Sequence, residues 1–255
     1  MVDFVGAGSG AKDLITVRGA RLLKEADVII YAGSLVNPEL LEYAKSDCEI
    51  YNSATMTLNE VIDVIKSTAS KNKKIVRLHT GDASIYGAIR EQMDILDELG
   101  IEYRVCPGVS AAFGAAASLN LEYTLPEISQ SLIITRMAGR TGVPKGESIE
   151  SFASHNTSMA IYLSTGMIGE LAERLIRGGY SKDTPAAIVY KATWPDEKAF
   201  VCTVGELEET AEKNNIKKTA IILVGDVIAH RDYDRSRLYA EDFSTEFRKA
   251  KVQKK

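Results

Sequence analysis

Short apolar runs alternate with amphipathic stretches along the first half of the chain. The apolar runs predict strands at residues 2–5, 28–31, 48–51, 74–79 and 103–106. Apolar positions at helical spacing predict helices at residues 16–25, 38–44, 58–70, 85–99 and 110–118. In the first of these helices we expect Val17, Ala20 and Leu23 to face the core. Strands separated by helices are typical of a mainly parallel sheet that is covered on both faces.

The second half of the chain also contains both predicted strands and predicted helices, but in a different order. It predicts strands at residues 132–135, 158–163, 186–190, 199–203 and 220–224, and helices at residues 169–177 and 205–213. Pro126 and its polar neighbours interrupt the apolar pattern at residues 120–127, where we place a domain boundary. We therefore expect an α/β chain with an N-terminal domain at 1–119, a C-terminal domain with a mixed sheet at 120–240, and a basic tail at 241–255.

Composition and charge narrow the class of protein. Of the 255 residues, 45% are hydrophobic and 26% are charged, which argues against disorder. The net charge is −4 and the two signs are interspersed, so we expect no nucleic-acid partner. The basic residues of the tail are Arg248, Lys249, Lys251, Lys254 and Lys255. A solvated or frayed terminus is the simplest interpretation of that cluster.

The cysteines and the lengths of the apolar runs indicate the cellular compartment in which the chain is expected. Cys48, Cys106 and Cys202 are odd in number and far apart, as in proteins of the reducing cytoplasm. The N-terminus lacks a signal-peptide pattern, and no apolar run reaches the ~18–20 residues that a membrane helix needs. The histidines form no ligand pattern with the cysteines, so we expect no protein-bound metal. These features predict a cytoplasmic chain without a membrane partner.

Three turns follow predicted strands of the first sheet. Residues 5–10 read Val-Gly-Ala-Gly-Ser-Gly, residues 80–82 read Thr-Gly-Asp, and residues 107–108 read Pro-Gly before a small-residue helix. Ligands of parallel α/β sheets bind beyond the carboxyl ends of the strands, where these turns are expected. Asp82 is either a carboxylate beside a cationic ligand or a cap of the following helix. His79 is either a structural histidine or a site residue.

The glycine-rich turn at residues 5–10 has more than one interpretation. Its glycines let the backbone approach a ligand closely. A nicotinamide dinucleotide is disfavoured, because the spacing is Gly-x-Gly-x-Gly and the second predicted strand ends without an acidic residue for a ribose. A tight turn without any ligand is a further interpretation.

Two arginines flank the start of a polar, glycine-bearing loop at residues 137–146. Arg136 ends the preceding predicted strand region and Arg140 lies within the loop. Planar guanidinium groups are suited to carboxylates, so the pair is a candidate site for an anionic substrate. An exposed loop without a ligand fits the spacing equally well.

At these motifs the chain resembles the tetrapyrrole methyltransferase family, over about residues 2–227. Residues 5–10 match the family's opening loop, and residues 31–36, 135–144 and 190–195 are similar to features of the branch that methylates ring carbon 11. The resemblance implies two α/β domains with a cofactor cleft between them, a homodimer, and S-adenosylmethionine as methyl donor. It implies that the substrate is a tetrapyrrole, precorrin-4 or cobalt-precorrin-4, methylated on the route to cobalamin.

Carried over by motif, the resemblance also implies site residues. Cofactor contacts are expected at Ser9, Thr80, Gly81, Asp82, Ile85, Ser110, Ala111, Leu163 and Ala192. We assign Asp82 to orienting the cofactor region, and Arg136 and Arg140 to substrate carboxylates, with any cobalt held inside the substrate. The chain departs from the family pattern, which usually has proline, aspartate, proline and proline at Ser9, Ala11, Ala83 and Gly142. The departures at Ser9 and Ala83 leave the contact geometry of the cofactor-facing loops open.

Three alternative functions fit the same sequence. The first is methylation at another ring carbon, or of another acceptor, by the same fold. The second is a nicotinamide-dependent oxidoreductase, and the third is a carrier that binds a tetrapyrrole without catalysis.

Overall fold

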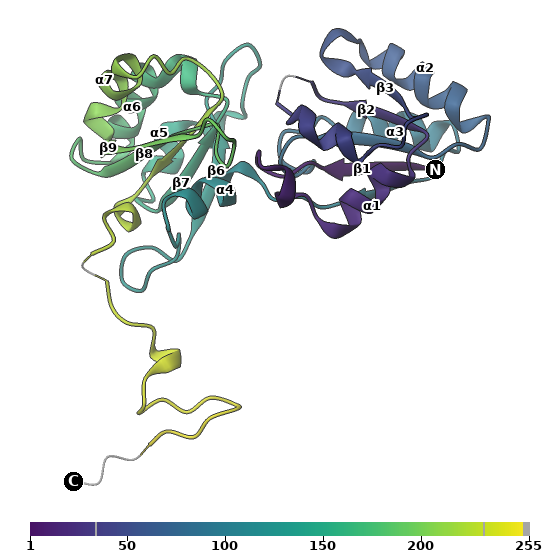
Figure 1. Ribbon diagram of the computed structural model, residues 1–255. Helices are drawn as coiled ribbons and strands as arrows, with labels where there is room; N and C mark the ends of the chain where they lie inside the picture. Colours follow the sequence, from purple (N-terminus) through teal and green to yellow (C-terminus); the bar gives the residue numbers. More distant parts are fainter. Residues whose placement is uncertain (34, 232, 252–255) are drawn as a thin grey trace. The chain divides into compact units, whose positions relative to one another are not determined.

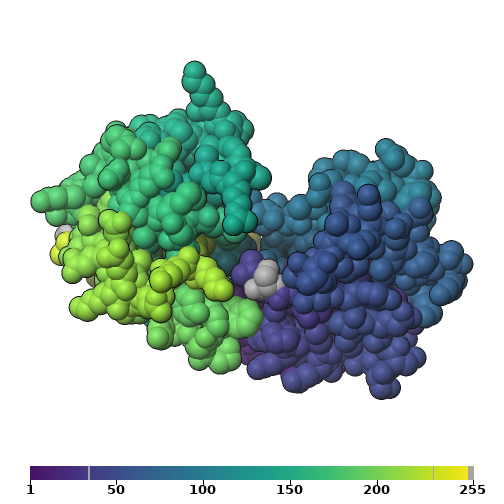
Figure 2. Space-filling model, turned by 90° about the horizontal axis from the view of Figure 1, so that it is seen from above, coloured from purple at the N-terminus to yellow at the C-terminus, as the bar shows by residue number. Residues whose placement is uncertain are grey.

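The chain forms two compact units in a computed structural model that describes residues 1–33, 35–231 and 233–251 (Figure 1). The first unit comprises Met1–Leu119 together with Val189–Ala199 and Lys218–Ile221, and the rest of the chain forms the second. In Figure 2 the purple to blue surface belongs to the N-terminal part of the first unit, while its two later segments share the green colours of the second unit. The domain ranges 1–119 and 120–240 stay a prediction, to which the structure adds that two later segments join the first unit.

A parallel sheet forms the centre of the first unit. Its five strands have the order β3-β2-β4-β1-β5, and every neighbouring pair is parallel. The strands are β1 (Val2–Gly6), β2 (Val28–Tyr31), β3 (Glu49–Asn52), β4 (Ile75–His79) and β5 (Tyr103–Cys106). The strands predicted from the apolar runs are confirmed. The inner strands β1, β2 and β4 are buried, as continuous apolar runs indicate, whereas the edge strands β3 and β5 are largely exposed.

Helices cover both faces of this sheet. They are α1 (Val17–Glu25), α2 (Leu58–Ala69) and α3 (Arg90–Glu98), while α4 (Ala111–Ser118) lies against Ser9 and Thr193 at Gly114. Side chains alternate between the faces along each strand. Val5 therefore packs in one buried cluster with Leu22 and Leu23 of α1, and Phe4 in another with Ile65 of α2 and Leu96 of α3. The covered parallel sheet predicted for the first half of the chain is confirmed.

The inward face of α1 is the expected one at Leu23, which is buried, and at Ala20, which packs against the same core, but not at Val17. Val17 is 90% exposed, whereas Gly19, Leu22 and Leu23 are buried. The hydroxyl of Thr16 accepts a hydrogen bond from Gly19 N at 3.0 Å and so fixes where the helix begins. From that start the stripe at 19, 22 and 23 faces the sheet, and Val17 is on the opposite side.

Two predicted helices of the first half have different limits or types. The helix expected at 85–99 begins only at Arg90, because Tyr86 and Ala88 adopt left-handed φ angles of 56° and 48°. The segment expected as a helix at 38–44 is a 3-10 helix, Pro38–Tyr43, with proline in its first turn.

The second unit contains a mixed sheet with the strand order β6-β7-β10-β8-β9. Its strands are β6 (Leu132–Arg136), β7 (Ser158–Tyr162), β8 (Pro185–Tyr190), β9 (Lys198–Thr203) and β10 (Ala220–Val224). Strand β7 pairs parallel with β6 and antiparallel with β10, so the mixed sheet expected here is confirmed. Its helices are α5 (Ile149–Ala153), α6 (Ile168–Gly178) and α7 (Leu207–Lys213). The short α5, which packs on α6, is absent from the sequence-based prediction.

The remaining helical segments are 3-10 turns. Besides Pro38–Tyr43 they are Lys12–Leu14, Ser53–Thr55, Lys145–Glu147, Thr165–Met167, Val204–Glu206, Asp226–Ala229 and Arg237–Tyr239. Among the described residues, no helix is both long enough and apolar enough to cross a bilayer.

The basic tail folds back on itself. The guanidinium of Arg248 donates to the carbonyls of Leu238 and Ala240, both at 2.7 Å. Lys254 and Lys255 of the tail, and Ser34 of the 31–36 motif, lie outside the described residues.

Candidate functional site

The carboxyl ends of β1, β4 and β5 come together at one edge of the first sheet. These strands are adjacent and parallel, so the turns that follow them are neighbours. Gly8 and Gly81 exchange two backbone hydrogen bonds, of 3.2 Å from Gly8 N and 2.9 Å from Gly81 N. Gly108 N in the third turn donates to Asp82 Oδ2 at 2.8 Å. The three turns singled out in the sequence therefore form one structure.

Glycine is required where these turns touch, because backbone lies against backbone. A Cβ atom on Gly108 would lie 2.2 Å from the carbonyl oxygen of Gly81, and a Cβ on Gly6 would lie 2.6 Å from the same oxygen. Gly8 and Gly81 also have φ angles of 84° and 59°, which favour glycine. The result is an edge of the sheet built from closely packed backbone rather than side chains, in which Gly6, Gly8 and Gly81 are buried.

Asp82 organises two of the turns. Its Oδ1 accepts from Ser84 N at 2.9 Å and from the Ser84 hydroxyl, while its Oδ2 holds Gly108. Partial burial raises the pKa of Asp82, but the hydrogen bonds from Ser84 and Gly108 outweigh burial and set the pKa below its ordinary value. Asp82 is thus a carboxylate that joins the β4 and β5 turns, and no helix begins at Ser84 for it to cap.

The neighbours of Asp82 lie on irregular backbone. Thr80 donates its hydroxyl to the carbonyl of Leu35 at 3.0 Å and so attaches the β4 turn to the segment after β2. Ile85 is half-buried in the turn that precedes α3. Ser110 is buried at the N-terminus of α4, with Ala111 as the first residue of that helix. The Cα of Ser110 and the amide of Ala111 lie 3.5 and 3.6 Å from the Cβ position of Gly81.

Ser9 meets a segment from far along the chain. Its hydroxyl lies 2.9 Å from the hydroxyl of Thr193, which also accepts from Ala11 N at 3.1 Å. Ala192, the preceding residue, is buried. The first unit therefore brings together eight of the residues expected at the cofactor: Ser9, Thr80, Gly81, Asp82, Ile85, Ser110, Ala111 and Ala192.

The other expected site residues belong to the second unit. Leu163 follows β7 with a left-handed φ of 53° and is 61% exposed. Arg136 donates to the carbonyls of Met137, Thr141 and Gly142 at 3.0, 3.2 and 2.7 Å. Its guanidinium therefore closes its own loop, whereas Arg140 is exposed on that loop. The roles of these residues stay a prediction.

His79 is a buried group at the end of the central strand β4. It is 5% exposed, stacks on Phe4 with ring centroids 6.0 Å apart, and its backbone carbonyl accepts from Ala7 N at 2.7 Å. Burial, together with the positive charge of Arg77, lowers its pKa from 6.5 to about 3. Its Nε2 has no hydrogen-bond partner among the described residues. The structural interpretation of His79 fits these surroundings.

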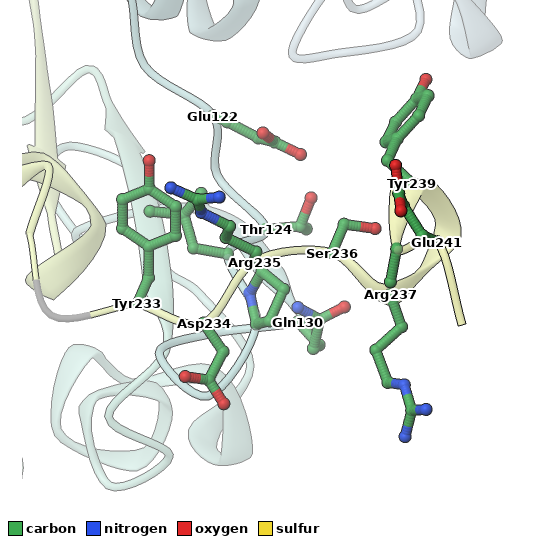
Figure 3. Close-up of a pocket in the computed structure, with 13 residues that line it drawn as sticks. Glu122, Thr124, Gln130, Tyr233, Asp234, Arg235, Ser236, Arg237, Tyr239 and Glu241 are labelled. Atoms are coloured by element: carbon green, nitrogen blue, oxygen red, sulfur yellow. The ribbon is translucent and has the colours of Figure 1, made fainter. Parts of the chain in front are cut away.

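A separate cavity of about 810 Å³ lies in the second unit (Figure 3). Its walls come from the chain around Glu122 and Gln130 and from the segment between Tyr233 and Glu241. It contains side chains of both charge signs and none of the site residues expected from the sequence. Among the described residues, no cluster of His, Cys, Asp and Glu is arranged to hold a metal ion.

Sequence reasoning missed the polar residues that connect the segments. They include Asn37, which is buried and donates to Gly10 O at 2.9 Å, and Glu197, which accepts from Thr193 N. Thr193 appeared in the sequence only as part of the 190–195 motif. No local pattern indicates the contact of Asn37 with Gly10 or that of Thr193 with Ser9, because the partners are more than twenty residues apart in the chain.

Comparisons with known proteins identify the family of the chain. Residues 1–208 match the family model described as Tetrapyrrole (Corrin/Porphyrin) Methylases. A Methanocaldococcus jannaschii protein named cobalt-precorrin-4 C(11)-methyltransferase is 52% identical over 98% of this chain and 96% of its own length. A Priestia megaterium protein of the same name is 43% identical, with 96% of each chain covered.

Solved structures give the same result. The crystal structure of a cobalt precorrin-4 methyltransferase of cobalamin biosynthesis superposes with a TM-score of 0.87 at 41% identity, covering 89% of this chain and 95% of that one. A uroporphyrin-III C-methyltransferase from Thermus thermophilus, complexed with S-adenosylhomocysteine, has a TM-score of 0.76 at 26% identity, covering 90% and 99%. The family expected from the motifs is confirmed, and the chain belongs to the tetrapyrrole (corrin/porphyrin) methylase family.

Proposed function

We propose that this chain transfers a methyl group from S-adenosylmethionine to carbon 11 of cobalt-precorrin-4 or precorrin-4 in cobalamin biosynthesis. The observation that carries the proposal is the likeness, at 52% and 43% identity over nearly the full length, to two proteins named for the cobalt form of this reaction. A Pseudomonas aeruginosa relative, 42% identical over 93% of this chain, is named for the metal-free form. Any cobalt therefore belongs to the substrate in this proposal.

The residues of the first unit fit a nucleoside cofactor. The glycine turns present backbone without bulky side chains at the edge of the sheet, and the small residues Ser110 and Ala111 lie next to Gly81. Asp82, whose carboxylate is ionised at neutral pH, supplies negative charge near a cationic sulfonium. We assign Ser9, Thr80, Gly81, Asp82, Ile85, Ser110, Ala111, Leu163 and Ala192 to this cofactor.

The task of the chain in this reaction is alignment. S-adenosylmethionine supplies, when bound, a methyl group that is already activated by positively charged sulfur, so no strong base is needed for the transfer. Holding donor and acceptor in line can contribute up to about 7–11 kcal/mol. The hydrogen bonds that lock the three turns together make such alignment possible, because the groups that face a ligand are fixed beforehand.

The proposal is tested by binding and by product analysis. Calorimetry is expected to detect S-adenosylhomocysteine binding to the purified chain. Incubation with S-adenosylmethionine and cobalt-precorrin-4 is expected to add one methyl group, located at carbon 11 by NMR. No binding of S-adenosylhomocysteine would contradict the proposal, and a methyl group on a different carbon would replace its substrate assignment. A homodimer in the cytoplasm is also part of the proposal, and sedimentation velocity tests the dimer.

The two arginines of the second unit have separate roles in this proposal. Arg140 is exposed and available for a substrate carboxylate, while Arg136 shapes the loop that presents Arg140. We expect Arg140→Ala to raise KM for the tetrapyrrole about tenfold, the effect of losing one charge-assisted hydrogen bond. The affinity for S-adenosylhomocysteine should not change.

Arg177→Ala, which removes an exposed arginine from α6, is the matched control and should leave both constants unchanged. If Arg136→Ala and Arg140→Ala both had the wild-type KM for the tetrapyrrole, the assignment of the arginines to substrate carboxylates would be wrong.

A further inference from the structure

We propose that Thr193 is a positioning residue for the cofactor, acting through the glycine loop at residues 8–11. This inference rests on the proposed function, and it assigns a task to the turn at residues 191–197, which follows β8.

The hydroxyl of Thr193 joins both ends of the glycine loop. It lies 2.9 Å from Ser9 Oγ and accepts from Ala11 N at 3.1 Å. Between these two residues, Gly10 packs against Trp194, since a Cβ on Gly10 would lie 2.1 Å from Trp194 Cδ1. The carbonyl of Gly10 is held from the other side by buried Asn37, at 2.9 Å. Three successive residues of the loop are thus fixed by side chains from elsewhere in the first unit.

The backbone at Thr193 is in a conformation that threonine rarely adopts. Its φ is 66°, and Lys191 two residues earlier has a φ of 47°. A β-branched residue is strained in this left-handed region, where glycine or asparagine adopts the conformation more easily. The strain persists because the surrounding contacts determine the turn. A threonine at such a position indicates that its hydroxyl has a task that glycine could not perform.

Glu197 supplies the contact that fixes Thr193. One carboxylate oxygen, Oε2, accepts from Thr193 N and from the hydroxyl of Ser118 on α4, the latter at 2.6 Å. The turn is closed by hydrogen bonds from Trp194 N to Lys191 O and from Glu197 N to Trp194 O, both 3.0 Å. The turn is therefore attached to α4, the helix whose first residues we assign to the cofactor.

The glycine loop connects Thr193 to the residues that we assign to the cofactor. Ser9 is itself an assigned cofactor contact, and its neighbour Gly8 pairs with Gly81 in the β4 turn. A cavity of about 380 Å³, lined by Ala11, Asn37 and Thr193 among others, opens beside the loop. Without the hydroxyl of Thr193, residues 9 and 11 lose their common partner and can move, although Gly8 stays paired with Gly81 and Gly10 stays bonded to Asn37. The expected consequence is weaker cofactor binding, with the methyl-acceptor site unaffected.

The test compares Thr193→Val with Thr193→Ser. Valine keeps the branched shape and the backbone strain but lacks the hydroxyl, whereas serine keeps the hydroxyl. We expect Thr193→Val to weaken S-adenosylhomocysteine binding about tenfold by calorimetry and to raise KM for S-adenosylmethionine by a similar factor. KM for the tetrapyrrole should stay at the wild-type value. Thr193→Ser should restore most of the affinity.

Thr57→Val is the matched control. Thr57 caps α2 in the same unit, where its hydroxyl accepts from Glu60 N, so its loss should lower Tm without changing S-adenosylhomocysteine affinity. Wild-type affinity in Thr193→Val overturns the inference and leaves the proposed function intact. Equal losses of affinity in the valine and serine variants also overturn it, because the hydroxyl would then not matter. Absence of binding by the wild-type chain overturns the proposed function and, with it, this inference.

Discussion

Replacing Gly108 with alanine is expected to abolish detectable binding of S-adenosylhomocysteine and to lower Tm by roughly 5–10 °C. The added Cβ would lie 2.2 Å from the carbonyl oxygen of Gly81 and 2.8 Å from the backbone of Gly6. Both neighbours are main chain, so no side chain can rotate away to make room. The turns after β1, β4 and β5 would have to separate, and the hydrogen bond from Gly108 N to Asp82 would be disrupted.

The size of this effect follows from overpacking. An extra methyl group in a well-packed region typically lowers the free energy of unfolding by about 1–3 kcal/mol. Because the contact at Gly108 is short and is made with rigid backbone, we expect a loss near the upper end of this range. Thermal unfolding followed by circular dichroism, together with calorimetry, measures both consequences. Gly146→Ala is the matched control, since a Cβ at Gly146 has no atom within 4 Å, and it should behave as the wild type. Wild-type affinity and Tm in Gly108→Ala would show that the turns do not need this close contact.

The same three turns show how much of the site could be predicted from sequence. Gly6, Gly81 and Gly108 each follow an apolar run, and the rule that parallel strands end at one edge of a sheet places their turns together. That inference needs only the strand type and its direction. Strands β1 and β4 were predictable because they are buried along their length and mainly apolar, whereas β5 is a largely exposed edge strand.

Positions that depend on tertiary contacts were less predictable. Val17 is apolar and at helical spacing, yet it is exposed, because the buried stripe of α1 is formed by Gly19, Leu22 and Leu23 on the opposite side of the helix. The start of α3 was placed too early, because nothing in the local pattern indicates left-handed residues at Tyr86 and Ala88.

The task of each polar side chain was the least predictable feature. Arg136 was assigned to a ligand from its type and loop, while the structure uses its guanidinium to hold three carbonyls of that loop. Thr193 was not assigned any role, although its hydroxyl connects two distant segments. Hydrogen-bond partners of this kind are set by the fold as a whole, because either partner alone has many possible neighbours.

Buried His79 is expected to make the chain less stable as the pH falls from about 6.5 towards about 3. In the folded chain, burial and Arg77 on the same face of β4 keep the imidazole neutral down to a pKa of about 3. Arg77 cannot move away easily, since it is buried and donates to Ile30 O at 3.0 Å and to Gln92 at 3.1 Å. In the unfolded chain the imidazole is hydrated and takes up its proton near pH 6.5. Between these two values the unfolded state binds more protons, so acid favours unfolding.

The measurement is the free energy of unfolding by urea, taken at several pH values between 7 and 4 at constant salt. His79 should lower the free energy of unfolding by at most about 1.4 kcal/mol for each unit that the pH falls. The full loss of stability is reached only near the pKa of His79 in the folded chain. His79→Phe keeps a flat ring against Phe4 and removes the titrating nitrogens, so its slope should be smaller than that of the wild type by this amount. His155 is exposed, and His155→Gln should reproduce the wild-type slope. Equal slopes for His79→Phe and the wild type would mean that His79 is protonated as readily in the folded chain as in the unfolded one. The prediction that the buried imidazole stays neutral would then be wrong.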